Sequence, residues 1–142
     1  MKKYIPIVLL VVAIDQITKV LARIFFEAEN KIIIENVFHL TFTKNTGAGF
    51  SILQGNNLLL IFITIAITAA LAYYFTKADD NEKLPLSLII GGAVGNLIDR
   101  VMHGGVIDFI QVSIWPVFNI ADMAISIGAI LLIMVIIKKK KD

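Results

Sequence analysis

Four long apolar runs dominate the sequence and limit the folds that it can adopt. The clearest is Leu58 to Phe75, eighteen residues without a charge, which is the length that an α-helix needs to cross about 30 Å of hydrocarbon. The predicted spans cover residues 4–26, 58–76, 84–101 and 120–137. In a chain of 142 residues, four such spans predict a single membrane domain, residues 1–142, with little room for anything else.

The composition agrees with a membrane protein and removes several kinds of chemistry. Apolar residues make up 58% of the chain and charged residues only 17%, whereas soluble domains are usually closer to half apolar and a quarter charged. There is no cysteine, so disulfides, metal thiolates and thiol nucleophiles are excluded. The first span also lacks the cleavage site of a secretory signal peptide, because Asp15, Gln16 and Ile17 follow its apolar stretch. We therefore expect this span to be retained.

Basic residues cluster in the segments that would lie on one side of the membrane. Eight of the thirteen Lys and Arg residues lie before the first span, between the second and third, or after the fourth. Short loops rich in Lys and Arg remain cytoplasmic. We therefore predict cytoplasmic termini, an inner loop at 77–83, and outer segments at 27–57 and 102–119. The run Lys138 to Lys141 is typical of an anchor facing anionic membrane lipids, and we expect no nucleic-acid partner.

The outer segments carry a strand pattern. Phe38, Leu40 and Phe42 alternate with polar residues, a period of two that indicates a β-strand with one apolar face. A second extended stretch, Val106 to Val112, follows a pair of glycines. The predicted fold class is therefore an α-helical membrane protein with four transmembrane helices and a small extracytoplasmic β-sheet platform. We expect the apolar face of the sheet to rest on the helix ends or on lipid headgroups.

Small residues line one side of the third span. Gly91 and Gly95 are four residues apart, with Gly92 beside them, and small residues at this spacing allow membrane helices to approach closely. Pro85 suits the first turn of this helix, where its missing N–H has no partner to lose. Asn96 is a candidate either for a hydrogen bond between helices or for holding a substrate backbone.

Three ionisable residues interrupt the first span. Asp15, Lys19 and Arg23 are spaced four apart, so they form one stripe along a helix. Each such residue costs about 2.5–3.5 kcal/mol to insert into a membrane. An ion-pair ladder facing the bundle, with the Arg23 side chain extending outward to the membrane surface, would offset part of that cost. For Asp15 and Lys19, a structural role at the border of a polar active site explains the pattern equally well.

Two further acids point to catalysis when they are taken together. Asp108 lies in the extended stretch, and Asp122 follows fourteen residues later at the start of the fourth span. Alone, Asp122 is explained by capping, because Asn119 would be the N-cap with an acid at the third helical position. Two carboxylates in contact at the same outer edge cannot both ionise. Such a pair would supply a base to activate water and an acid to protonate a leaving amine.

Asp99 is the acid that competes most closely with this pair. It ends the third span beside Arg100, at a helix C-terminus where the dipole disfavours an acid. The two neighbours could form a simple interfacial ion pair. We expect Asp99 to pair with a cation or a backbone donor and to hold the loop that leads to Asp108.

Five short motifs resemble, in their order and intervals, the sequence boxes of the lipoprotein signal peptidases. Each box is weak alone, but the set of five is highly specific. One departure is Gly49, where the family more often has alanine. The boxes are Asp15-Gln16-Ile17-Thr18-Lys19, Asn45-Thr46-Gly47-Ala48-Gly49-Phe50-Ser51, Gly91-Gly92-Ala93-Val94-Gly95-Asn96-Leu97-Ile98-Asp99-Arg100, Val106-Ile107-Asp108-Phe109 and Phe118-Asn119-Ile120-Ala121-Asp122.

The resemblance implies a bacterial inner-membrane aspartic endopeptidase of the signal peptidase II type, with its active site at the outer face. Such enzymes remove the signal peptide from prolipoproteins just before a diacylglyceryl-modified cysteine, and the antibiotic globomycin occupies their substrate groove. We expect no metal and no cofactor. By similarity, Asp108 and Asp122 are the catalytic pair. The residues expected to bind substrate or support the site are Asp15, Lys19, Asn45, Gly92, Asn96, Asp99, Arg100 and Asn119.

Two other classes of protein also fit part of the sequence. A small four-helix multidrug-type transporter would use an acid in its first span, but it should place that acid at mid-membrane and have short loops. The long outer segment 27–57 argues against this class. A non-catalytic membrane scaffold would not need Asp108 and Asp122.

Overall fold

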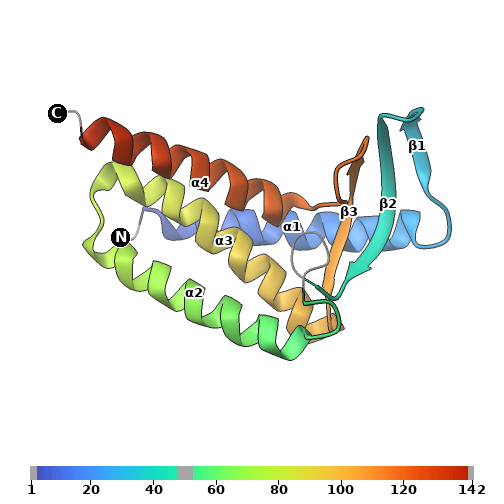
Figure 1. Ribbon diagram of the computed structural model, residues 1–142, viewed down its shortest axis with the longest axis horizontal. Helices are drawn as coiled ribbons and strands as arrows, with labels where there is room; N and C mark the ends of the chain where they lie inside the picture. The colour runs from blue at the N-terminus through green and yellow to red at the C-terminus, as the bar shows by residue number, and fades with distance from the viewer. Residues whose placement is uncertain (1–2, 48–52, 141–142) are drawn as a thin grey trace.

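The structure, a computed structural model, describes residues 3–47 and 53–140 and consists of helices at one end and a small sheet at the other (Figure 1). The four helices of the described residues are all long and apolar enough to cross a membrane, and three strands form an antiparallel sheet, so the predicted fold class is confirmed. Both termini lie at the end opposite the sheet. The elements, in chain order, are α1 (Ile5–Phe26), β1 (Lys31–Ile34), β2 (Phe38–Asn45), α2 (Asn57–Lys77), α3 (Asp80–His103), β3 (Val106–Val112) and α4 (Ile120–Lys139).

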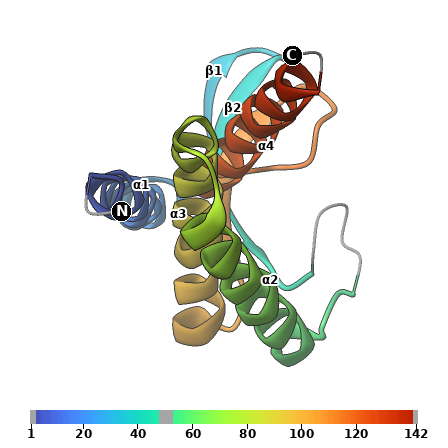
Figure 2. The ribbon, with the colours of Figure 1, turned by 90° about the vertical axis from the view of Figure 1, so that its left-hand side faces the viewer.

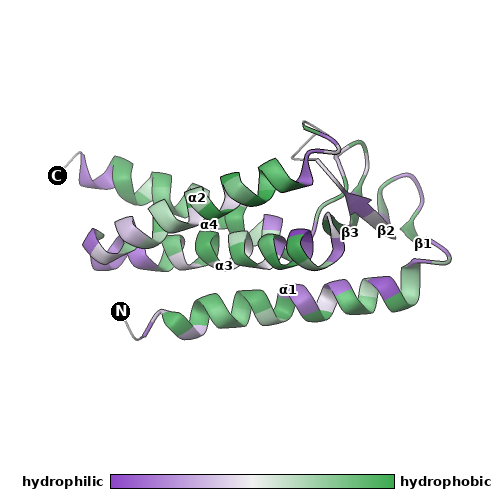
Figure 3. Cartoon of the chain, turned by 90° about the horizontal axis from the view of Figure 1, so that it is seen from below, coloured by the Kyte–Doolittle hydropathy of each residue, from purple (hydrophilic) through white to green (hydrophobic). Residues whose placement is uncertain are grey.

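Helix α3 is the centre of the bundle. It packs against α1, α2 and α4, and Figure 2, which looks along the helices, shows it between them. Half of its membrane-spanning window is buried, whereas almost none of the α2 window is buried. The outward surfaces of α1, α2 and α4 are correspondingly apolar, and the hydrophilic residues gather at the helix ends and beside the sheet (Figure 3). A lipid environment would cover these outward surfaces.

Glycines bring the neighbouring helices close to α3, as the spacing predicted. A Cβ at Gly95 would lie 2.6 Å from Oδ2 of Asp15 on α1, and one at Gly92 would collide with the carbonyl oxygen of Ala121 on α4. Because no side chain separates the backbones, small residues allow tight helix packing in a membrane. Gly92 and Gly95 therefore place the start of α4 and the middle of α1 directly against α3.

Helix α3 begins earlier than the sequence suggested. Asp79 is its N-cap, and Glu82 completes a capping box with the backbone N–H of Asp79. Pro85 consequently lies inside the helix rather than in its first turn, so that prediction is wrong. The connection from α2 is only Ala78 and Asp79, much shorter than the predicted inner loop, because the acid-rich segment caps the helix instead of remaining irregular.

The sheet has the order β1-β2-β3 and is antiparallel throughout. β1 was not predicted, since Lys31–Ile34 has no polar alternation and all four residues are exposed. The most buried residue of β2 is Thr41, which belongs to the polar set of the alternating pattern. Its hydroxyl group donates a hydrogen bond to Oδ1 of Asn30 at 2.6 Å. The apolar residues of this strand are only half-buried. An irregular register between Leu40 and Thr43 interrupts the simple two-faced pattern.

Candidate active site

A cavity of about 620 Å³ lies where the helix ends meet the sheet. Both Asp108 and Asp122 line it, together with Asn45, Asn96 and Arg100, and its remaining walls come mainly from residues 115–118 and 123–127. A larger cavity, about 950 Å³, lies at the opposite end of the bundle, but its walls carry ion pairs between largely exposed side chains. Size alone therefore does not identify the site, whereas convergent buried polar groups do.

Asp108 enters the cavity from β3 and is almost completely buried, at 2% exposed. Its carboxylate accepts hydrogen bonds from Nδ2 of Asn45 at 3.0 Å and from Nδ2 of Asn119 at 2.7 Å. Burial, reinforced by the nearby charge of Asp122, raises the pKa of Asp108 from 3.8 to about 7, although both amides oppose the shift. A carboxyl group in this state exchanges its proton near neutral pH.

Asp122 reaches the same cavity from the first turn of α4. The predicted capping box is present: the side chain of Asn119 accepts from the backbone N–H of Asp122 at 2.8 Å, and Asp122 accepts from that of Asn119 at 3.2 Å. Asp122 also accepts from Nδ2 of Asn96 at 2.8 Å. The structural and catalytic interpretations of Asp122 are therefore compatible, since one carboxylate caps the helix and faces the cavity.

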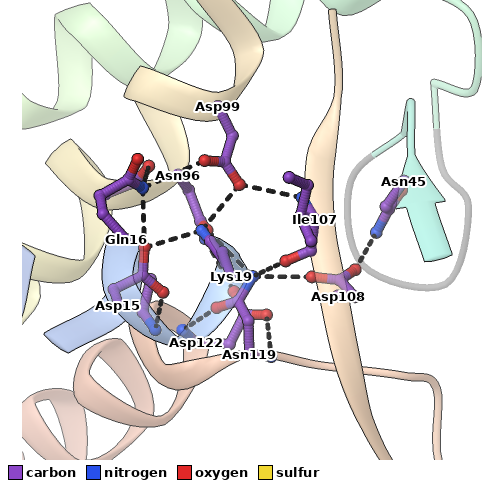
Figure 4. A network of polar contacts seen from close by, with 12 residues as sticks. Asp15, Gln16, Lys19, Asn45, Asn96, Asp99, Ile107, Asp108, Asn119 and Asp122 are labelled. Atoms are coloured by element: carbon purple, nitrogen blue, oxygen red, sulfur yellow. Dashed lines mark hydrogen bonds and ion pairs between the residues drawn. The ribbon is translucent and has the colours of Figure 1, made fainter. Parts of the chain in front are cut away.

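Asn119 joins the two acids (Figure 4). Its fully buried amide donates to Asp108, to Oδ1 of Asn96 at 3.1 Å and to the carbonyl oxygen of Ile107 at 3.2 Å. Within the part of the chain that the structure describes, no direct hydrogen bond connects the carboxylates of Asp108 and Asp122. The expected direct contact is thus replaced by a bridge through one residue: the side chain of Asn119 donates to Asp108, and its backbone N–H donates to Asp122.

A buried cation lies behind the acids. The ammonium group of Lys19 is 2.8 Å from Oδ2 of Asp15 and 2.9 Å from Oδ2 of Asp99, and all three side chains are at least 98% buried. Lys19 also donates to Oδ1 of Asn96 at 3.0 Å. Arg23 points outward, as expected: its side chain is half exposed and pairs with Glu27 at 3.4 Å rather than extending the buried ion-pair chain. Asp99 occupies that place in the ion-pair chain instead.

Asp99 makes both kinds of contact that its position suggested. It pairs with Lys19, and it accepts a hydrogen bond from the backbone N–H of Ile107 at 2.9 Å, one residue before Asp108. It does not pair with Arg100, so the interfacial pair is wrong. Arg100 donates instead to the carbonyl oxygen of Gly47 at 2.7 Å, because successive residues of a helix point in different directions.

Two polar residues of the site were missed from the sequence. Nδ2 of Asn57 donates to the carbonyl oxygen of Arg100 at 3.0 Å, and its Oδ1 accepts from the guanidinium at 3.3 Å. Nε2 of Gln16 lies within 3.2 Å of oxygens of Asp15, Gly95 and Asp99. Gln16 belongs to the first motif, which was the available signal, whereas nothing in the sequence distinguishes Asn57 from an ordinary helix-start residue.

The structure brings every predicted site residue to one end of the bundle. The polar ones share one network of contacts, and Gly92 packs behind it against the first turn of α4. Gly47 connects Arg100 to this network, since its N–H donates to Oδ1 of Asn45 at 2.9 Å. The fold and site define a class: a multi-pass membrane protein with two carboxylates in the wall of one cavity.

The particular family follows from comparison with known proteins. Residues 7–138 match the family model described as signal peptidase (SPase) II. The chain is 44% identical to a lipoprotein signal peptidase of Halothermothrix orenii over 95% of both chains, and 42% identical to one of Moorella thermoacetica over 91% of this chain and 89% of that one. The chain therefore belongs to the lipoprotein signal peptidase family.

Solved structures agree with this assignment. One, titled as a bacterial membrane enzyme at 2.3 Å resolution, has a TM-score of 0.89 and 36% identity, and the match covers 99% of this chain and 90% of that one. A second, at 1.9 Å, has a TM-score of 0.86 with 36% identity, covering 97% and 94%. The protein is thus a peptidase with a prolipoprotein substrate and a multi-pass protein of the bacterial inner membrane. Family membership decides against the transporter and scaffold alternatives.

Proposed function

We propose that the protein is an aspartic endopeptidase that removes signal peptides from diacylglyceryl-modified prolipoproteins, with Asp108 and Asp122 as its catalytic pair. The observation that carries this proposal is the meeting of two carboxylates, from separate elements, at one cavity, where Asn119 contacts both. Paired carboxylates in a partly desolvated site hold one proton between them near neutral pH. The pair therefore contains a base and an acid at the same time.

The chemistry follows from that shared proton. The ionised carboxylate removes a proton from water, and the water oxygen attacks the carbonyl carbon of the scissile peptide bond. The protonated carboxyl group then donates its proton to the departing amine as the C–N bond breaks. We assign the proton-holding role to Asp108, whose pKa is about 7 because it is buried beside Asp122. The proton nonetheless belongs to the pair, since strongly coupled groups titrate together.

The surroundings of the pair suit a substrate that is part helix and part lipid. The cavity walls include Trp115, Phe118, Met123 and Ile127, an apolar surface for acyl chains or a signal-peptide helix. In this proposal the site lies at the outer membrane face and both termini are cytoplasmic, as the basic residues near the termini favour. Globomycin-type inhibitors and membrane lipids would occupy the same apolar walls.

The supporting residues have roles that their contacts suggest. Asn45 and Asn96 each donate to one catalytic carboxylate. Arg100 lines the cavity and donates to the carbonyl oxygen of Gly47, so we assign it to positioning Gly47 beside the substrate backbone. None of these roles requires a metal or a cofactor.

A purified-protein assay tests the proposal directly. The full chain in lipid nanodiscs is incubated with a diacylglyceryl-modified prolipoprotein, and mass spectrometry identifies the products. We expect cleavage on the N-terminal side of the modified cysteine, no cleavage of the unmodified precursor, and full activity in EDTA. Asp108→Asn should be inactive, and Arg23→Met, at an exposed position outside the site, should be fully active. Unchanged cleavage by Asp108→Asn would remove this acid from the mechanism.

A further inference from the structure

Lys19, Asp15 and Asp99 form a buried ion triplet that the proposed chemistry does not use. None of the three lines the cavity, so none is placed to touch the substrate. All three are nonetheless held by short contacts, and their side chains are almost inaccessible to solvent. A buried charge cluster of this kind is expensive unless it is fully paired, so its presence calls for a role that an apolar cluster would not provide.

The two carboxylates of the triplet make matching contacts with the two catalytic segments (Figure 4). Asp99 accepts from the backbone N–H of Ile107 at 2.9 Å, and Asp15 accepts from the backbone N–H of Ala121 at 2.9 Å. Ile107 directly precedes Asp108, and Ala121 directly precedes Asp122. Each catalytic acid is thus preceded by a peptide unit that is hydrogen-bonded to one member of the triplet.

We infer that Lys19 is a positioning residue, which rests on the proposed function of Asp108 and Asp122. By binding Asp99 and Asp15 together, its ammonium group sets the relative placement of the peptide units before the two catalytic acids. Helix α1 therefore holds the catalytic pair in place, although it contributes no group to the cavity. We call this arrangement of Lys19, Asp15 and Asp99 the clamp.

The bonding of the ammonium group explains why a lysine is suited to this place. An ammonium group has three N–H donors, and Lys19 directs them to Asp15, Asp99 and Oδ1 of Asn96. The third contact extends the clamp, because Nδ2 of the same Asn96 donates to Asp122 at 2.8 Å. A neutral side chain of equal length would fill the space but would connect none of these groups.

Steady-state kinetics in nanodiscs, with a diacylglyceryl-modified prolipoprotein as substrate, tests the clamp. Lys19→Met should lower kcat by about tenfold or more, since a displacement of about 1 Å at reacting groups has effects of this size. KM should change by no more than about twofold, because no substrate contact is removed. Arg23→Met, one turn further along α1, is the matched control and should leave both constants unchanged.

The pH profile of Lys19→Met gives a second readout. The charged groups that face Asp108 are Asp122 from α4, Lys19 from α1 and Arg100 from α3. Lys19 and Arg100 favour the ionised form of Asp108, and Asp122 opposes it. Loss of the lysine charge should therefore move the high-pH limb of kcat/KM to higher pH, a change that a purely structural defect would not produce.

A triple variant keeps the test decisive if Lys19→Met does not fold. Lys19→Met combined with Asp15→Asn and Asp99→Asn removes the buried charges but retains side-chain oxygens that can accept from Ala121 and Ile107. We expect this variant to fold, by its melting transition, and still to show kcat reduced about tenfold or more. Wild-type kcat in the triple variant would overturn the clamp, because Lys19 would then only neutralise two acids.

The two proposals fail in different ways. If Asp108→Asn and Asp122→Asn cleave normally, the proposed dyad is wrong and the clamp falls with it. If those variants are inactive but Lys19→Met has wild-type kcat and an unshifted pH profile, only the clamp is wrong.

Discussion

At the scale of single residues, the site depends on groups whose properties are set by their neighbours. Asp108 and Asp122 both accept hydrogen bonds from Asn119, one from its side chain and one from its backbone N–H, and the burial of Asp108 keeps its proton available near neutral pH. Neither acid could do both halves of the proposed reaction, because a single carboxyl group cannot be protonated and ionised at once. The pair should therefore behave as one unit in mutational tests.

Non-additivity is the first expected consequence. Asp108→Asn and Asp122→Asn should each reduce kcat to background, and the double variant should be little worse than either single variant, because members of one catalytic unit act together. Prolipoprotein cleavage by the three purified variants measures this. If the two effects multiply, the acids act independently and the shared-proton mechanism is incorrect.

A pH dependence of activity and stability is the second expected consequence. Because the pKa of Asp108 is about 7 in the folded protein, against 3.8 for an ordinary aspartate, kcat/KM should fall above pH 7 as the proton is lost. Between pH 4 and 7 the folded state binds more protons than the unfolded state, so Asp108 makes the protein less stable as the pH rises. The full effect is on the order of 4 kcal/mol.

Thermal melts at pH 5 and pH 8 check the stability half of this expectation. Asp108→Asn does not titrate, so its melting temperature relative to that of the wild type should rise between the two pH values. The test is the change of this difference between pH 5 and pH 8, not its size at one pH. Asparagine also changes one hydrogen bond to Asn45 or Asn119, and that effect on the melting temperature is the same at both pH values. An equal difference at both pH values would show that Asp108 is not the group with the raised pKa.

At the scale of elements, the turn from α3 to β3 places Asp108 in the wall of the cavity. Asp99 holds that turn through Ile107 and is itself held by Lys19. Asp99→Asn should lower thermal stability, since breaking a buried ion pair costs about 3–5 kcal/mol. It should leave measurable cleavage per folded molecule, unlike Asp108→Asn. A fully stable but inactive Asp99→Asn would indicate that Asp99, rather than Asp108, belongs to the catalytic pair.

The contact between α3 and α4 places Asp122, which lies in the first turn of α4. This contact gives a second prediction at the scale of elements. A methyl group at Gly92 would meet Ala121 and Ile125 on α4, so Gly92→Ala should displace the first turn of that helix. Overpacking of this kind costs about 1–3 kcal/mol, and kcat should fall with it. Val20→Ile, which also adds one carbon but on the exposed surface of α1, is the size-matched control. Wild-type kcat and melting temperature in Gly92→Ala would show that the helices tolerate greater separation.

At the scale of the whole molecule, the sheet and both termini lie at opposite ends of the bundle. The native chain has no cysteine, so single cysteines report orientation cleanly. In intact cells, cysteines at Glu35 and Asn56 should react with a membrane-impermeant reagent, and one at Asn81 should react only after the membrane is opened. Labelling of the Asn81 variant from outside would reverse the proposed topology.

Much of the fold was predictable because it rests on local properties of the sequence. Long apolar runs predict membrane helices in any context, and alternation around Leu40 predicts a strand. The capping of α4 by Asn119 was also local, since both partners lie within one turn. β1 was not predicted, because its three consecutive isoleucines lack the alternation of apolar and polar residues that marks a half-buried strand.

The sequence by itself determined most of the side chains that occupy the candidate site, Asn57 being the exception, through five motifs with polar residues in a chain that otherwise favours lipid. Only the tertiary structure decided how those residues are connected. Asp15 reaches the N–H of Ala121 across 106 positions, and Asp99 reaches that of Ile107 across a helix end. Every residue except proline carries the same backbone N–H, so nothing in the identities of Ala121 and Ile107 marks them as partners. Their positions in the folded chain alone make them so.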